Sequence, residues 1–159
     1  MMFSNQIKLN LKKHKMSSNL LMNKYIETNN FGRLLGMHFE VISPGNAHYF
    51  LTIKEKHLAT PLAAHGGCTA ALLDATMGVG ALSLVYDNHQ AVATLEMKVT
   101  FLKSVALHDE LKAKSIVMKQ GNSLIFMEAE VYNSKNQLIA KSSGTFTVLN
   151  AEKSGYLKN

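Results

Sequence analysis

With 159 residues, of which 47% are hydrophobic and 18% charged, the chain has the size and balance of one globular domain rather than two. The single cysteine excludes an internal disulfide, and no apolar run approaches the roughly 18 residues of a transmembrane helix. The formal net charge is +6, but residues 1–24 hold five lysines and no acid, and removing those five charges leaves +1. We therefore expect a soluble, cytoplasmic protein with neither membrane nor nucleic acid as partner.

The basic segment at residues 1–22 is expected to be a disordered arm, because low hydrophobicity combined with like charge favours disorder. Met16 and Met22 are alternative start positions within it. A contact of the arm with nucleic acid or an anionic surface is the competing interpretation. The folded domain is predicted over residues 23–150, followed by a flexible tail at residues 151–159.

The domain begins with a predicted helix and a β-hairpin. Apolar residues at helical spacing predict a short helix over residues 20–31, which Gly32 would end. Two strands joined by a Ser-Pro-Gly-Asn turn follow, with the strands at residues 37–42 and 48–53 and the turn at residues 43–46.

One long helix is predicted over residues 68–85, after a loop at residues 57–64. The segment is too long and too rich in Ala, Leu and Met for a strand, and it lacks a polar face, so it should be buried all round. Gly78 and Gly80 each cost such a helix about 1 kcal/mol relative to Ala. We interpret them as notches that admit a wrapped sheet or a partner helix.

Beyond this helix the hydrophobic pattern changes to a period of two. Apolar residues from Ala93 to Phe101 alternate with polar ones and predict a half-buried strand. Three more strands, joined by short links, are predicted at residues 110–119, 123–133 and 138–149. The predicted fold is therefore α+β, a curved antiparallel sheet wrapped around one long central helix.

One acid, Asp74, lies inside the apolar helix and is the first candidate for chemistry. A carboxylate in apolar surroundings must be paired, protonated or put to use, because its desolvation costs several kcal/mol. A structural Asp that bonds to a neighbouring strand or faces water at an interface is the competing interpretation.

The triplet His65-Gly66-Gly67 before the helix is the second candidate. Backbone N–H groups at a helix start lack intrahelical partners and carry the positive end of the dipole, and glycines let a carbonyl group approach them. Such donors suit an oxyanion and contribute about 3 kcal/mol each to transition-state stabilisation. For His65 alone, capping or packing at the helix start is the competing role.

Asp74 follows His65 by nine positions, about 13 Å along a helix, so it cannot reach the helix start of its own chain. If both residues serve one reaction, the acid must come from a second copy whose helix runs antiparallel beside the first. The site would then straddle a two-fold interface, which predicts a homodimer or a dimer of dimers.

Residues 65–74, HGGCTAALLD, resemble the HGG-x6-D signature of hotdog-fold acyl-CoA thioesterases of the phenylacetate-degradation type. The similarity continues at Thr94, where that family often has Ser or Thr near the thioester, and at residues 99–104, which resemble the exit of its third strand. Residues 119–124 are similar to a turn that contacts the pantetheine or nucleotide of CoA. The resemblance covers roughly residues 31–149 and implies the hotdog fold.

The resemblance also implies an activity, the hydrolysis of acyl-CoA to free acid and CoA. Gly66 N–H would polarise the thioester carbonyl with His65 and Thr94 nearby, and Asp74 of the partner chain would act as nucleophile or as base for water. The residues implied in substrate binding are Gly67, Lys103, Ser104, Lys119, Gly121, Asn122 and Ser123. CoA is part of the substrate, and no metal or redox cofactor is expected, since the seven histidines lack metal-ligand spacing.

Three alternatives remain open. Ala59 stands six residues before His65, where the family commonly has Asn or Gln, so a hotdog acyl-CoA-binding or sensor module with little hydrolysis is conceivable unless Thr60 or Thr94 compensates. A Cys68–His65 nucleophile is the second, because a thiol in a first helical turn can have a lowered pKa. The third alternative is a hotdog dehydratase or hydratase. Such an enzyme would need a His/Asp or His/Glu acid–base pair, which this motif order does not favour.

Overall fold

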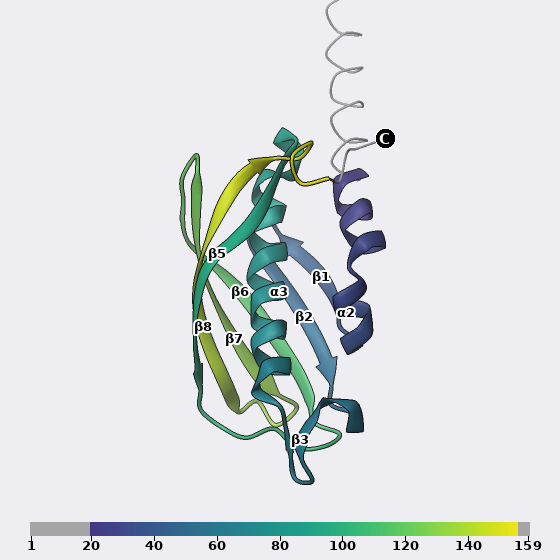
Figure 1. Cartoon of the computed structure of the whole chain (residues 1–159). Coiled ribbons are helices and arrows are strands. Elements are labelled where there is room, and N and C mark those ends of the chain that lie inside the picture. Colours follow the sequence, from purple (N-terminus) through teal and green to yellow (C-terminus); the bar gives the residue numbers. More distant parts are fainter. Residues whose placement is uncertain (1–19, 156–159) are drawn as a thin grey trace, which may run out of the picture.

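The computed structural model describes residues 20–155, in which a six-stranded antiparallel sheet curves around one long helix, α3 (Gly66–Val85) (Figure 1). The strands of this sheet are β1 (His38–Ser43), β2 (Asn46–Thr52), β5 (Gln90–Phe101), β6 (Glu110–Gln120), β7 (Leu124–Asn133) and β8 (Leu138–Asn150). Their order across the sheet is β1-β2-β6-β7-β8-β5. The predicted α+β class and the wrapped architecture are confirmed.

Before the sheet the chain forms two short helices, whereas one was predicted. Residues 20–28 form the first, which we call the leading helix, and α2 (Asn30–Leu35) follows. The Asn29 side chain caps α2 by accepting from the backbone N–H of Gly32 at 2.9 Å. Gly32 therefore lies inside a helix, and the stop is Gly36, whose left-handed φ of 79° favours glycine.

Most of the predicted arm, residues 1–19, and the end of the predicted tail, residues 156–159, lie outside the described residues. Within the described part the chain is already packed at Leu21, which is 1% exposed. Leu21 forms a small hydrophobic cluster with Leu82 and Ala151. The leading helix is thereby held alongside α3 (Figure 1).

The predicted loop at residues 57–64 contains a small hairpin instead. The 3-10 turn η1 (Glu55–His57) leads into β3 (Leu58–Thr60) and β4 (Ala63–Ala64). Thr60 Oγ1 accepts from the backbone N–H of Ala63 at 3.1 Å and closes the turn between these strands. Strands of three and two residues are too short to leave a periodic pattern in the sequence.

One side of α3 is only partly covered, although the sequence predicted burial all round. Leu72, Leu73 and Met77 are fully buried, whereas Asp74 and Gly78 retain partial exposure. By length and composition α3 with the following η2 (Tyr86–Asn88) could cross a membrane, a test that the core helix of a soluble protein also passes. Most of this helix is buried within the sheet.

The two helix glycines have different neighbours. A Cβ on Gly80 would lie 2.5 Å from Ser115 Oγ and 2.9 Å from Met127 Cε, so Gly80 lets β6 and β7 approach the helix backbone. A Cβ on Gly78 would meet only Phe146, at an ordinary 3.7 Å. The expected approach of a wrapped sheet is therefore found at Gly80.

β5 lies at the edge of the sheet and is more exposed than its alternating pattern predicted. Among the described strands it pairs only with β8, and the register shifts between Thr94 and Glu96. Leu95 and Phe101 are 58% and 54% exposed. The half-buried prediction fails for these two side chains and for Ala93, which is also exposed, because β5 has no neighbouring strand on its other side within the described chain.

Candidate active site

His65 caps the start of α3 through its own side chain. His65 Nδ1 accepts from the backbone N–H of Gly67 at 2.8 Å, and a Cβ on Gly67 would lie 2.8 Å from the same nitrogen. Gly67 is therefore required for the cap. The Gly66 N–H is the first backbone amide of α3, and at this position an amide has no intrahelical carbonyl to which it can donate. Gly66 is also exposed. This amide is available to a ligand oxygen.

A hollow of about 300 Å³ lies against Gly66. Phe101, Lys103 and Ser104 line it from the segment at the end of β5. The structure thus brings Lys103 and Ser104, two of the predicted substrate-binding residues, to the same place as the predicted oxyanion donor. A cation and a hydroxyl beside an exposed helix N-terminus suit a ligand with negative charge.

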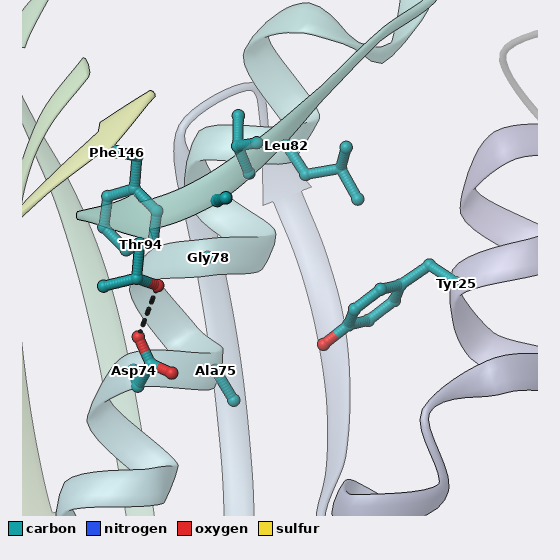
Figure 2. Close-up of a pocket in the computed structure, with 9 residues that line it drawn as sticks. Tyr25, Asp74, Ala75, Gly78, Leu82, Thr94 and Phe146 are labelled. Carbon is teal, nitrogen blue, oxygen red and sulfur yellow. Dashed lines mark hydrogen bonds between the residues drawn. The ribbon is translucent and has the colours of Figure 1, made fainter. Parts of the chain in front are cut away.

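Asp74 and Thr94 are brought together on the partly exposed side of α3. Thr94 Oγ1 donates to Asp74 Oδ1 at 2.8 Å, as Figure 2 shows. Both residues line a pocket of about 180 Å³ whose other walls are mainly apolar, with Gly78 and Phe146 among them. A positioned carboxylate therefore stands at the edge of an apolar pocket. A structural Asp bonded to a neighbouring strand would show this hydrogen bond as well.

The predicted site residues lie in three separate places within one chain. The first is the start of α3 with Lys103 and Ser104, and the second is Asp74 with Thr94. The third is the β6–β7 turn with Gly121, Asn122 and Ser123, together with Lys119 near the end of β6. Figure 1 shows this turn at the opposite end of the sheet from the start of α3. No single chain places these three groups around one substrate.

Cys68 does not have the surroundings of a nucleophile. Its Sγ lies 3.8 Å from the carbonyl oxygen of His57, and burial raises the pKa of its thiol. The nitrogen Nδ1 of His65 bonds to Gly67 rather than to the thiol. The alternative in which the helix start lowers this pKa is not supported, because desolvation outweighs the nearby positive charge of Lys56. Within residues 20–155, no three His, Cys, Asp or Glu side chains cluster as metal ligands do.

A buried histidine that the sequence analysis did not single out, His57, holds the segment before α3. His57 is 1% exposed; its Nε2 donates to the carbonyl of Leu35 at 2.9 Å, and its Nδ1 accepts from Lys54 N–H at 3.0 Å. The His57 carbonyl accepts from His65 N–H at 2.7 Å. Burial lowers the pKa of His57 below its ordinary 6.5, which keeps the ring neutral. Its Leu35 partner lies 22 positions earlier, so no local pattern revealed that His57 is buried.

Comparison with known proteins gives consistent matches. A family model of the thioesterase superfamily matches residues 63–140. Human acyl-coenzyme A thioesterase 13 is 28% identical over 119 residues, which are 73% of this chain and 83% of that protein. The structure of the E. coli PaaI protein from the phenylacetic acid degradation operon matches with a TM-score of 0.73 at 20% identity, over 82% of this chain and 94% of that one. A hypothetical thioesterase from Streptococcus pneumoniae, solved with coenzyme A, matches with a TM-score of 0.66 at 23% identity, over 72% and 87%.

The wrapped helix is that of the hotdog-fold structures to which the chain is similar, and the sequence matches are to thioesterases. The HGG-x6-D motif, Thr94, Lys103 and Ser104 all fall within the matched residues 63–140. Over residues 63–140 the chain is similar to the thioesterase superfamily, and its fold is that of the PaaI structure, which agrees with the resemblance its motif gave.

Proposed function

We propose that the chain hydrolyses acyl-CoA thioesters to free acid and CoA in a site shared by two copies of the chain. The observation that carries this proposal is the 2.8 Å hydrogen bond from Thr94 to Asp74 beside an apolar pocket. It orients a carboxylate on the accessible side of an otherwise apolar helix. A relative that is an acyl-coenzyme A thioesterase, and a structural neighbour solved with coenzyme A, support CoA as the thiol part of the substrate.

Two copies are needed because the helix rise separates Gly66 from Asp74 by about 12 Å. In an antiparallel pair, Gly66 of one chain faces Asp74 of the other if the two-fold axis passes near residue 70, midway between them. Ala70 and Ala71 stand there and are partly exposed, and their small side chains allow two helices to approach closely. Each dimer then has two equivalent sites.

The edge of β5 that pairs with no other strand among residues 20–155 supports the same pairing of two copies. An edge strand presents unpaired backbone N–H and C=O groups, and an antiparallel β5 of a second copy would satisfy them. Because the second copy runs antiparallel to the first, its β6–β7 turn lies near the end of the first copy's sheet where α3 begins. CoA would then be held by Lys103 and Ser104 of one chain and by Lys119 and residues 121–123 of the other.

A further association of two dimers is supported by the outer face of the sheet. Ile116, Met118 and Phe126, on β6 and β7, are 47%, 58% and 40% exposed. Apolar side chains gathered on one face favour burial against another protein surface. We therefore include the dimer of dimers in the proposal.

In the proposed reaction, Asp74 acts as base for water or as nucleophile. As base, it takes a proton from the water that attacks the thioester carbonyl, while the Gly66 N–H of the partner subunit stabilises the negative charge on the carbonyl oxygen. The C–S bond then breaks, and CoA leaves as a thiolate that is protonated. As nucleophile, Asp74 forms a mixed anhydride that water cleaves. Thr94 orients the carboxylate in either case, and His65 contributes by capping the helix that carries Gly66.

A binding or sensor module with little hydrolysis is the second candidate, and Ala59 is the observation that favours it. Ala59 is exposed on β3, and its methyl group offers no donor to a carbonyl or to water. The Thr60 hydroxyl oxygen accepts from the backbone N–H of Ala63 within the turn, which leaves its O–H able to donate.

The first test is release of free CoA thiol from short, medium, long and aromatic acyl-CoAs, with binding measured in parallel. Turnover that disappears in Asp74→Asn supports the thioesterase, whereas tight binding without turnover in either protein supports the sensor.

The shared site has a sharper test in mixed dimers. Gly66→Pro removes the amide donor at the first helical position, where proline is tolerated, and Asp74→Asn removes the acid. Each variant should be inactive alone. After mixing and subunit exchange, half of the dimers would be hybrids with one intact site, so activity should recover to about a quarter of wild type. Folded variants that exchange subunits without any recovery would contradict a shared site.

A further inference from the structure

We propose that the leading helix limits the size of the acyl group. Tyr25 and the cluster around Leu21 close the pocket behind Asp74, so the enzyme accepts a compact acyl group, about as large as a benzene ring, and rejects long chains. This inference rests on the proposed function, because it places the acyl part of the thioester in the pocket beside Asp74.

The pocket runs along one face of α3, away from the carboxylate. Asp74, Gly78 and Leu82 all line it and follow one another at intervals of four residues, which places them on one side of the helix. The rise over these eight residues is about 12 Å. In Figure 2, Asp74 and Thr94 lie at one end of this row and Leu82 at the other. An acyl group whose carbonyl is near Asp74 would therefore point toward Leu82.

The walls between these ends suit hydrocarbon. Ala75 and Gly78 line the pocket from α3, Val92 lines it from β5, and Phe146, which is 1% exposed, lines it from β8. Because Ala75 and Gly78 have small side chains or none, they leave space for the acyl group between the walls. Within the described part of the chain, no charged group other than Asp74 lines the pocket. Burial of apolar acyl carbons here is favourable, at about 25 cal/mol per Å².

The far end is closed by the leading helix. Leu82 is 3% exposed and packs with Leu21 and Ala151, and the partly buried Tyr25 and Val92 pack against the same cluster. Figure 2 shows the Tyr25 side chain extending from the leading helix toward α3. A chain that grew past Leu82 would have to displace this cluster.

Tyr25 is held in place by neighbours on two sides. Its hydroxyl lies 3.0 Å from the hydroxyl of the fully buried Tyr49, and Asn29 Nδ2 donates to it at 3.3 Å. Its ring meets Phe39 edge to face, with the centroids 5.8 Å apart. Because these contacts fix the ring, Tyr25 forms a wall rather than a side chain that swings aside.

The capacity of the pocket is small. Its volume is about 180 Å³. An apolar cavity of about 150 Å³ accommodates one benzene molecule, so the pocket has room for about six carbons or a single ring. Dodecanoyl and hexadecanoyl groups exceed this capacity.

The test compares kcat/KM for butanoyl-, hexanoyl-, benzoyl-, dodecanoyl- and hexadecanoyl-CoA, together with the binding of their non-hydrolysable thioether analogues. Wild type should favour hexanoyl and benzoyl over the two long chains by at least about tenfold. Tyr25→Ala should raise the ratio of dodecanoyl to hexanoyl by on the order of tenfold. Tyr25→Phe, which keeps the ring, and Ile26→Ala, on the exposed side of the same helix, should leave this ratio unchanged.

Gly78→Ala is a second variant that does not depend on the leading helix. Its Cβ makes only an ordinary contact with Phe146, so the fold tolerates it, while the added methyl narrows the pocket. The ratio of benzoyl to butanoyl should fall on the order of tenfold.

The two proposals fail in different ways. Absence of turnover with every acyl-CoA would overturn the thioesterase proposal, and the binding order of the thioethers would still decide the pocket size. A wild type that prefers hexadecanoyl in both measurements would overturn the size limit. Folded Tyr25→Ala and Gly78→Ala proteins with an unchanged acyl profile would overturn it as well.

Discussion

Asp74→Asn should abolish turnover while leaving the folded dimer intact. The amide keeps the size of the side chain and an oxygen that accepts from Thr94 Oγ1, which lies 2.8 Å from the carboxylate in the wild type. It cannot take a proton from water at neutral pH, and it is a poor nucleophile. A general base contributes typically about 10²- to 10⁴-fold, or about 3–5 kcal/mol, so kcat should fall at least about a hundredfold.

Stability should change little in the same variant. Asp74 is partly exposed, and its carboxylate accepts a hydrogen bond from Thr94 that Asn can still accept, so the free energy of unfolding should shift by less than about 1 kcal/mol. Thiol release measures turnover, urea unfolding measures stability, and sedimentation measures the oligomer. A variant that keeps most of its turnover would refute the role of Asp74 in the reaction. A variant that loses activity only because it unfolds would support the structural interpretation of this acid.

Substitutions at four other positions test separate parts of the reasoning. Thr94→Val should lower kcat about tenfold or more, because the carboxylate of Asp74 is no longer held by a hydrogen bond, whereas Thr94→Ser should keep most of the wild-type kcat. Equal kcat values in the two variants would show that the hydroxyl has no role in catalysis. Ala59→Asn should raise kcat by up to about a hundredfold if the added amide reaches the carbonyl or the water, and an unchanged rate would show that it does not. Cys68→Ala should keep most activity, since the pKa of this thiol is raised by burial, and total loss would restore the thiol mechanism. Burial lowers the pKa of His57 below 6.5, so the folded protein binds a proton at this ring less readily than the unfolded chain does. The stability that the neutral ring contributes is therefore complete above pH 6.5 and is lost as the pH drops toward the pKa of the folded state. Thermal melts from pH 7.5 to 5 should show this loss in wild type and a smaller one in His57→Gln; identical pH profiles would exclude His57 as its source.

Much of the fold could be predicted because its longer elements carry local periodic signals. The period-two pattern beyond residue 90 predicted the four strands that became β5 to β8, and the apolar run before it predicted α3. The short elements carried no such signal. The break at Asn29 and the β3–β4 hairpin depend on caps and turns of a few residues, so one helix and one loop were predicted in their place.

For the active site, local sequence is sufficient for the motif but not for its surroundings. The order His-Gly-Gly and the acid after it identify a helix start and a carboxylate, and the helix rise alone shows that one chain cannot bring them together. The hydrogen bond of Asp74 to Thr94 joins residues 20 positions apart, and Tyr25 reaches the same pocket from the leading helix. These contacts arise only when the sheet wraps around α3, because the pairing of distant segments depends on side-chain packing rather than on local backbone preference.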